Sequence, residues 1–284
     1  MIHKVSKLLI LIVFALMANF CPGCSSSDEN NNHSRMRHQK GEYIYRKQGE
    51  TQFAVDSPEK IPNKVYPWDK MSVGNHPPIT KEYFRCKGSS LNPCHSVLKN
   101  NELQHCYDCG GIEKHSLPLC NGKEHIYPIL IDLLNHIQAT TSKRVVITCG
   151  HRCTEHNTYA DPSTQNQYSK HMIGAEVSFY VQGMEEHPEI IVKYIQDFYR
   201  DKLSYQGKKE YTEFRRYEKD DTNVSTQPWY NKEVFVKLFN KNEGRNFDNR
   251  HPYPYISIQV RYDRDLGQNV NYSWDKAYRN YLRW

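Results

Sequence analysis

The sequence predicts an α+β domain with a mostly antiparallel sheet and flanking helices. Apolar residues recur at helical spacing in residues 123–138 and 188–199, which predicts two amphipathic helices. Short runs with alternating or β-branched apolar residues predict strands at 145–147, 175–181, 233–239 and 255–262. Strands and helices do not alternate regularly, so a parallel βαβ arrangement is disfavoured. The charged stretch 201–227 predicts a solvated excursion or lid.

The first residues of the chain predict an exported protein. Residues 1–23 contain Lys4 and Lys7, followed by an apolar run that is too short to span a membrane. This order is typical of a secretory signal. Gly23 stands before Cys24 and serines follow, as at the cleavage site of a bacterial lipoprotein. We therefore expect lipid on Cys24 and an anchor to a membrane of the bacterial cell envelope, facing the periplasm or the surface. Ordinary cleavage after another small residue is the alternative.

The rest of the chain is expected to divide into three parts. Residues 24–42 are mostly polar and predict a disordered tether. A Cys-rich N-terminal region follows at 43–122, and the main domain occupies 123–284. The formal net charge of +6 falls to +4 once the two lysines of the signal are removed. This mild basic excess suits an anionic envelope surface and is too sparse to predict nucleic-acid binding.

Seven cysteines lie between residues 86 and 153, and exported chains meet an oxidising environment. Cys106 and Cys109 have the spacing of half a zinc ribbon or of a redox pair. A second pair of this spacing is missing, so disulfides are the preferred interpretation. We expect Cys149 to bond to Cys153 or to a cysteine of the N-terminal region. The odd number leaves at least one of the seven free or paired elsewhere.

Three segments resemble the motifs of the M15 peptidases, the zinc D-Ala-D-Ala carboxypeptidases and related peptidoglycan endopeptidases. ITCGHRCTEHN at 147–157 resembles the family pattern S-G-Y-R-S-x-x-x-N. SKHMIGAEVSF at 169–179 resembles S-x-H-x-x-G-x-A-x-D, and PYISIQVR at 254–261 resembles P-W-V-H-I-D-V-R. The resemblance covers residues 123–284 and implies a Hedgehog/DD-peptidase-like fold there, with the Cys-rich region as an N-terminal extension.

The resemblance also implies zinc as cofactor and peptidoglycan stem peptides as partners. The zinc ligands would stand at His171, Ser178 and Ser257, and the catalytic carboxylate at Gln259. Of these four, only His171 is a conventional zinc ligand, because neutral serine hydroxyls hold zinc poorly. Gln259 cannot accept a proton from a metal-bound water as a carboxylate does. The substitutions therefore predict weak or lost catalysis.

Other motif residues complete the candidate site. The planar guanidinium of Arg152 suits a terminal carboxylate, and the resemblance implies a substrate contact for Arg152 and for Ser169. A surface salt bridge is the alternative for Arg152. Glu176 shares a strand face with position 178, because side chains alternate along a strand, and it is a candidate displaced metal ligand. His151 or His156 would then supply the missing third ligand.

Three functions fit these patterns. The preferred one is an envelope lipoprotein of M15 shape that binds or acts on stem peptides with weak or lost catalysis. The second is an active zinc peptidase with rearranged ligands, in which zinc polarises a carbonyl and a bound water attacks it. The third is a non-enzymatic, cysteine-stabilised envelope scaffold. Zinc content separates the second function from the others, and muropeptide binding separates the first from the third.

Overall fold

The computed structural model describes residues 71–99, 101–111, 115–161, 169–244, 249–273 and 277. The predicted signal, Cys24 and the tether lie outside these residues. The described residues all belong to one compact unit, Lys64–Trp284. None of the helices they form is both long enough and apolar enough to cross a membrane.

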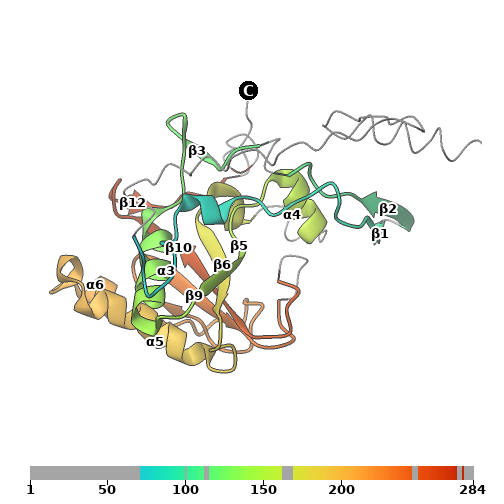
Figure 1. The fold of residues 1–284 in the computed structure, drawn as a ribbon. Helices are drawn as coiled ribbons and strands as arrows, with labels where there is room; N and C mark the ends of the chain where they lie inside the picture. The colour runs from blue at the N-terminus through green and yellow to red at the C-terminus, as the bar shows by residue number, and fades with distance from the viewer. Residues whose placement is uncertain are drawn as a thin grey trace, which may run out of the picture. The chain divides into compact units, whose positions relative to one another are not determined.

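The described part of the chain is a mixed α and β structure (Figure 1). Its helices are η2 (Lys81–Phe84), α3 (Pro128–Thr141), α4 (Thr154–Ala160), η4 (Lys170–Ile173), α5 (Pro188–Asp201), η5 (Leu203–Tyr205) and α6 (Lys209–Thr212). Its strands are β1 (His95–Lys99), β2 (Glu102–Cys106), β3 (Leu119–Cys120), β4 (Lys123–Glu124), β5 (Val145–Cys149), β6 (Glu176–Val181), β7 (Arg215–Arg216), β8 (Trp229–Tyr230), β9 (Val234–Phe239), β10 (Tyr255–Val260), β11 (Tyr262–Asp263) and β12 (Gln268–Asn269).

The main sheet has six strands in the order β5-β6-β10-β9-β8-β7, and all neighbouring pairs are antiparallel. The prediction of a mostly antiparallel sheet with flanking helices is confirmed. The four predicted strands correspond to β5, β6, β9 and β10, each within two residues of the expected bounds at either end. Two short strands, β8 and then β7, extend the sheet beyond β9.

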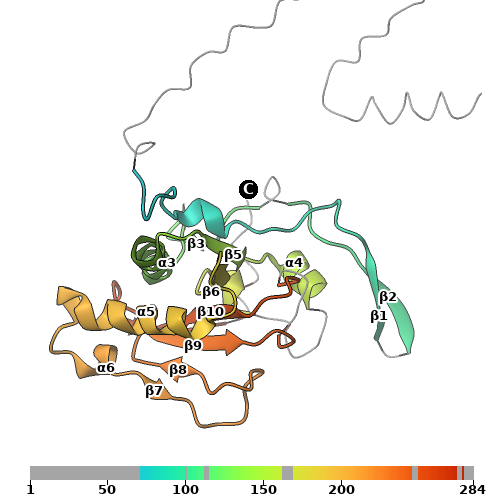
Figure 2. The same cartoon turned by 60° about the horizontal axis from the view of Figure 1, so that its bottom comes forward.

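Helices α3 and α5 cover one face of this sheet and pack against each other (Figure 2). Because side chains alternate along a strand, Ile256, Ile258 and Val260 of β10 enter the hydrophobic core beneath these helices. Ser257 and Gln259 consequently point to the opposite face of the sheet. The polar motif positions thus lie on the face that the two helices leave uncovered.

Helix α3 begins later than the sequence pattern suggested. Residues 123 and 124 form strand β4, and the helix starts at Pro128, whose fixed φ and missing N–H are tolerated in a first turn. The helix ends before Ser142, which adopts a left-handed conformation with φ 51°. Its predicted apolar stripe is confirmed from the first turn onward. The stripe residues buried in the core are Ile129, Leu130, Leu133, Leu134 and Ile137.

The Cys-rich region is joined to the main domain by a shared core. Ile79, Phe84 and Leu117 belong to the same buried cluster as the helices and the sheet. The carbonyl of Phe84 also accepts a hydrogen bond of 2.6 Å from the N–H of His151, in the first M15-like motif. The hydrophobic core therefore continues across the boundary expected between residues 122 and 123.

Strands β1 and β2 form a hairpin that stands away from the main sheet in both views (Figures 1 and 2). Leu98 and Leu103 are paired across it and are 72% and 62% exposed. A tie to the body comes from His95, whose Nε2 donates a hydrogen bond of 2.7 Å to the carbonyl of Tyr159 in α4.

The stretch 201–227 is more ordered than a solvated excursion. It forms η5, α6 and β7, and Tyr205 and Tyr211 are buried in the main core. The guanidinium of Arg216 lies 3.9 Å from the ring centroid of Trp229 on the neighbouring strand. The expectation of a purely solvated segment is therefore wrong for these residues, because its aromatic side chains pack while its charged ones face solvent.

Candidate functional site

The register of β6 and β10 brings the second and third motifs together. Ser178 lies opposite Ser257, and Glu176 lies opposite Gln259. The Ser257 hydroxyl donates a hydrogen bond of 2.6 Å to Oε1 of Glu176, and Nε2 of Gln259 donates one of 3.0 Å to the same oxygen. Residues more than 80 positions apart thus meet at one buried carboxylate.

His171 reaches the same carboxylate from the short helix η4. The hydroxyl of Ser169 caps this helix and accepts a hydrogen bond of 3.2 Å from the N–H of His171. Nδ1 of His171 donates to the carbonyl of Gly150 at 2.7 Å, because a carbonyl oxygen can only accept. Nε2 of the ring then faces Oε1 of Glu176 at 3.7 Å. Ser169, expected to contact substrate, is used here to position His171.

Glu176 is held as an anion by its neighbours. Burial raises the pKa of this carboxyl, but the nearby His171 and the hydrogen bonds from Ser257 and Gln259 outweigh burial, so the net shift of the pKa is downward. The carboxylate therefore needs no metal ion to stay ionised at neutral pH.

His171 and Glu176 lack a third metal ligand among the described residues. His156 instead pairs with Asp108, at 2.6 Å between Nδ1 and Oδ1. His151 lies beside His115, with ring centroids 6.1 Å apart, and burial together with the neighbouring histidines lowers its pKa to about 3. Neither of these histidines joins His171 and Glu176 in a group of three ligands. The expectation that one of them completes a metal site on this face is therefore wrong.

Arg152 is buried and only 4% exposed. Its N–H donates a hydrogen bond of 3.4 Å to the carbonyl of His171, which fixes the first motif to the second. The side chain is enclosed by protein, whereas a surface ligand for a peptide carboxylate has to be accessible. Arg152 would have to become accessible to make the expected substrate contact, which stays a prediction.

The three motifs thus assemble a single polar face whose parts come from η4, β6 and β10. Comparisons with family models, curated proteins and solved structures find no match. The resemblance to the M15 peptidases therefore rests on the motif residues of this chain.

An open pocket of about 410 Å³ borders the polar face at Gln259. The ionisable and aromatic side chains that line it are the cations Lys170, Lys237 and Arg261, the rings of Tyr217, Tyr230 and Phe235, and the carboxylate of Asp221. Burial lowers the pKa of Lys170; Glu176 opposes this shift, and Arg261 and Lys237 add to it. The pocket combines an excess of positive charge with aromatic walls.

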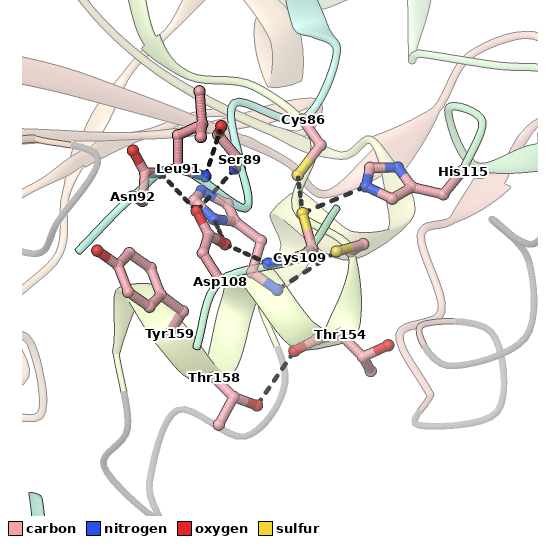
Figure 3. A network of polar contacts seen from close by, with 12 residues as sticks. Cys86, Ser89, Leu91, Asn92, Asp108, Cys109, His115, Thr154, Thr158 and Tyr159 are labelled. Atoms are coloured by element: carbon pink, nitrogen blue, oxygen red, sulfur yellow. Dashed lines mark hydrogen bonds and ion pairs between the residues drawn. The ribbon is translucent and has the colours of Figure 1, made fainter. Parts of the chain in front are cut away.

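A second group of ligand-type side chains joins the first motif to the N-terminal region. Cys86, Cys109, His115 and Cys153 are all buried, and one ligand atom from each lies within 4.8 Å of the others. The Cys109 sulfur is 4.0 Å from that of Cys86 and 3.5 Å from Nε2 of His115 (Figure 3). Asp108 and His156 form an adjoining group with Cys109. This buried Cys/His/Asp cluster can hold a metal ion.

The expected disulfides are not formed in the structure. None of the seven described cysteines is in a disulfide bond. Cys153 lies in the buried cluster and Cys149 at the end of β5, so the proposed bond between them is absent. Of the pair Cys106 and Cys109, only Cys109 takes part in the cluster. The two cysteines of the C-x-x-C spacing therefore do not share one group of ligands.

Proposed function

We propose that this protein is an envelope lipoprotein of Hedgehog/DD-peptidase-like shape that binds peptidoglycan stem peptides beside Glu176 and does not cleave them. The observation that carries the proposal is the position of Gln259. Its amide donates to the Glu176 carboxylate, and the same residue borders the cationic pocket. Where the resemblance implies a catalytic carboxylate next to substrate, this chain has a neutral hydrogen-bond donor next to a ligand-sized pocket.

Binding is supported by the charge of the pocket. A stem peptide ends in a carboxylate, and Lys170, Lys237 and Arg261 offer three cations to it. The aromatic walls can cover the apolar parts of the peptide. These contacts replace the one expected from Arg152, and none of them depends on a metal ion.

Loss of hydrolysis is supported by the hydrogen bonds around Glu176. Two donors occupy the oxygen that would bind a metal, and His171 is the only conventional ligand beside it among the described residues. A zinc-bound water would also lack a base, since the Gln259 amide cannot accept its proton. Such a base contributes about 10² to 10⁴ in rate to hydrolases.

The test is to measure muropeptide binding by calorimetry on the full chain in detergent, and D-Ala release in the same samples with added zinc. The double variant Lys170→Gln/Lys237→Gln should bind at least about tenfold more weakly, because hydrogen bonds to charged groups are worth about 1.5–3 kcal/mol. Lys193→Gln, on the exposed side of α5, is the matched control and should bind as the wild type does. Equal binding by the double variant and the wild type would contradict the proposal.

An active zinc peptidase is the second candidate, and one observation favours it. Nε2 of His171 and Oε1 of Glu176 are 3.7 Å apart, and the other ring nitrogen donates to a backbone carbonyl, as in metal-bound histidines. Zinc-dependent D-Ala release that is lost in both His171→Ala and Glu176→Gln would establish this function. Muropeptide binding without zinc-dependent D-Ala release would support the non-hydrolytic function.

A further inference from the structure

We propose that Cys86, Cys109, His115 and Cys153 form a structural zinc site of the Cys₃His type, which fastens the N-terminal region to the loop that carries Arg152. This site is separate from the polar face of Glu176. One of its ligands, Cys153, belongs to the first M15-like motif and directly follows Arg152 in the chain.

Two of the distances between the ligand atoms match the edges of a tetrahedron around zinc, and the others lie within 4.8 Å. Zinc lies about 2.3 Å from thiolate sulfur and about 2.0–2.1 Å from imidazole nitrogen. The tetrahedral edges are then about 3.8 Å between two sulfurs and about 3.6 Å between sulfur and nitrogen. The observed separations are 4.0 Å for Cys86 and Cys109, and 3.5 Å for Cys109 and His115. A disulfide would require about 2.05 Å.

The chemistry of the four side chains favours an ion over a disulfide. A disulfide between any two of the cysteines would leave one thiol and the imidazole of His115 enclosed together. Zinc uses all four groups, and three thiolates with one histidine form a complete structural coordination shell. All four side chains are buried, which leaves no open position for a water or a substrate. The site is therefore structural and not catalytic.

Hydrogen bonds from neighbouring groups hold the ligands in place (Figure 3). The N–H of His156 donates to the Cys153 sulfur at 3.3 Å, and the N–H of Cys109 donates to Oδ1 of Asp108 at 2.7 Å. Asp108 also accepts from the N–H of Ser89 at 3.0 Å. Such contacts orient ligands around a metal and raise its affinity.

Gly88 shows how closely the ligand loops approach each other. A Cβ built on this residue would collide with the Cys109 sulfur and crowd Oδ1 of Asp108 and Nδ1 of His156. Residue 88 is fully packed among these groups, and the loop after Cys86 passes directly over the cluster. Glycine allows the backbone to come this close.

The experiment is metal analysis of the full chain, made with its own leader and extracted in detergent without reductant. We expect about one zinc per chain, released when the thiols are titrated with an organomercurial. Protein purified from cells grown with cobalt in place of zinc should show thiolate-to-cobalt charge-transfer bands. It should also show the visible absorption bands of tetrahedral cobalt. This readout uses the wild-type protein and is independent of whether any variant folds.

Variants then locate the ion. Cys109→Ser and Cys153→Ser should lose the zinc, whereas Cys94→Ser and Cys120→Ser, at exposed cysteines, should keep it. His115→Cys should keep the metal with a shifted cobalt spectrum, because it supplies a fourth thiolate. His171→Ala should also keep it. Zinc that is lost only in His171→Ala would place the ion on the polar face and overturn the proposal. A metal-free chain with two of the three cluster thiols oxidised would overturn it in favour of a disulfide.

Discussion

The Ser257 hydroxyl lies 2.6 Å from Oε1 of Glu176 and donates a hydrogen bond to it across the β6–β10 ladder. The resemblance to the M15 peptidases implies a metal ligand at position 257. A histidine at this position would attract a cation. The serine instead donates a hydrogen bond to a neighbouring carboxylate. The face is thereby stabilised by hydrogen bonds within the protein, and an ion is not needed to neutralise its buried charge.

Replacing this donor should destabilise the fold. Ser257→Ala leaves the buried Glu176 carboxylate with one donor fewer, and we expect the free energy of unfolding to fall by about 1–3 kcal/mol. Urea denaturation followed by circular dichroism measures the change. The exposed Ser204→Ala is the control and should stay within about 0.5 kcal/mol of the wild type. An equal effect of the two substitutions would show that the hydrogen bond contributes nothing.

Glu176 should also make stability depend on pH in the acid range. Its pKa is lower in the folded state than the ordinary value of 4.5, so the unfolded chain binds more protons there. The resulting stabilisation is present above about pH 4.5 and is lost as the pH falls through the lowered pKa. In thermal melts across this range, the melting temperature of Glu176→Gln should fall less steeply with decreasing pH than that of the wild type. Glu189→Gln, at a surface site 61% exposed, should retain the wild-type slope.

The N-terminal region should contribute to the stability of the main domain through Phe84. This side chain is fully buried in the shared core, whereas its neighbour Tyr83 is 41% exposed. Phe84→Ala should cost about 3–5 kcal/mol, as truncation of a buried aromatic residue does, and Tyr83→Ala should be nearly neutral. Denaturation of both variants by urea tests this. A small cost for Phe84→Ala would mean that residues 71–122 fold as a separate unit.

Export and anchoring are tested at Cys24, which lies outside the described residues. We expect the mature chain to begin at a lipidated Cys24, so that the wild type partitions into the detergent phase and Cys24→Ser does not. Mass spectrometry of the mature N-terminus identifies the lipid directly. Cys21→Ser is the matched control and should partition as the wild type does. If the Cys24→Ser chain is still cleaved and still partitions into the detergent phase, Cys24 is not the anchor.

The elements with a strong periodic pattern could be predicted from the sequence. Helices α3 and α5 and strands β5, β6, β9 and β10 bury one regular face each, and this requirement is visible in the residues themselves. Strands β7 and β8 have two residues each, which is too short for any period. Strand β8 forms because β9 offers an edge to pair with, and β7 then pairs with β8. Only the assembled sheet provides these edges.

The polar face was predictable because each motif is local and the strand register then aligns them. The cysteine cluster was not, because its ligands are separated by 23, 6 and 38 positions in the chain. Packing of Phe84 against the loop of His151 brings Cys86 and Cys153 together, and no spacing rule encodes that contact. One local signal was present in Cys109 and His115, two ligand types on one short stretch of an unusually Cys-rich region.

The projecting β1–β2 hairpin lies in the sequence between two residues of the cysteine cluster, Cys86 and Cys109. Exposed loop tips are where proteases usually cut. A cut between Lys99 and Glu102 would sever the chain, yet both new ends would stay fastened, one through Cys86 and Phe84 and the other through Cys109. The shared core around Phe84 and the proposed zinc ion would hold the two fragments together, so the hairpin provides a place to open the chain without taking the protein apart.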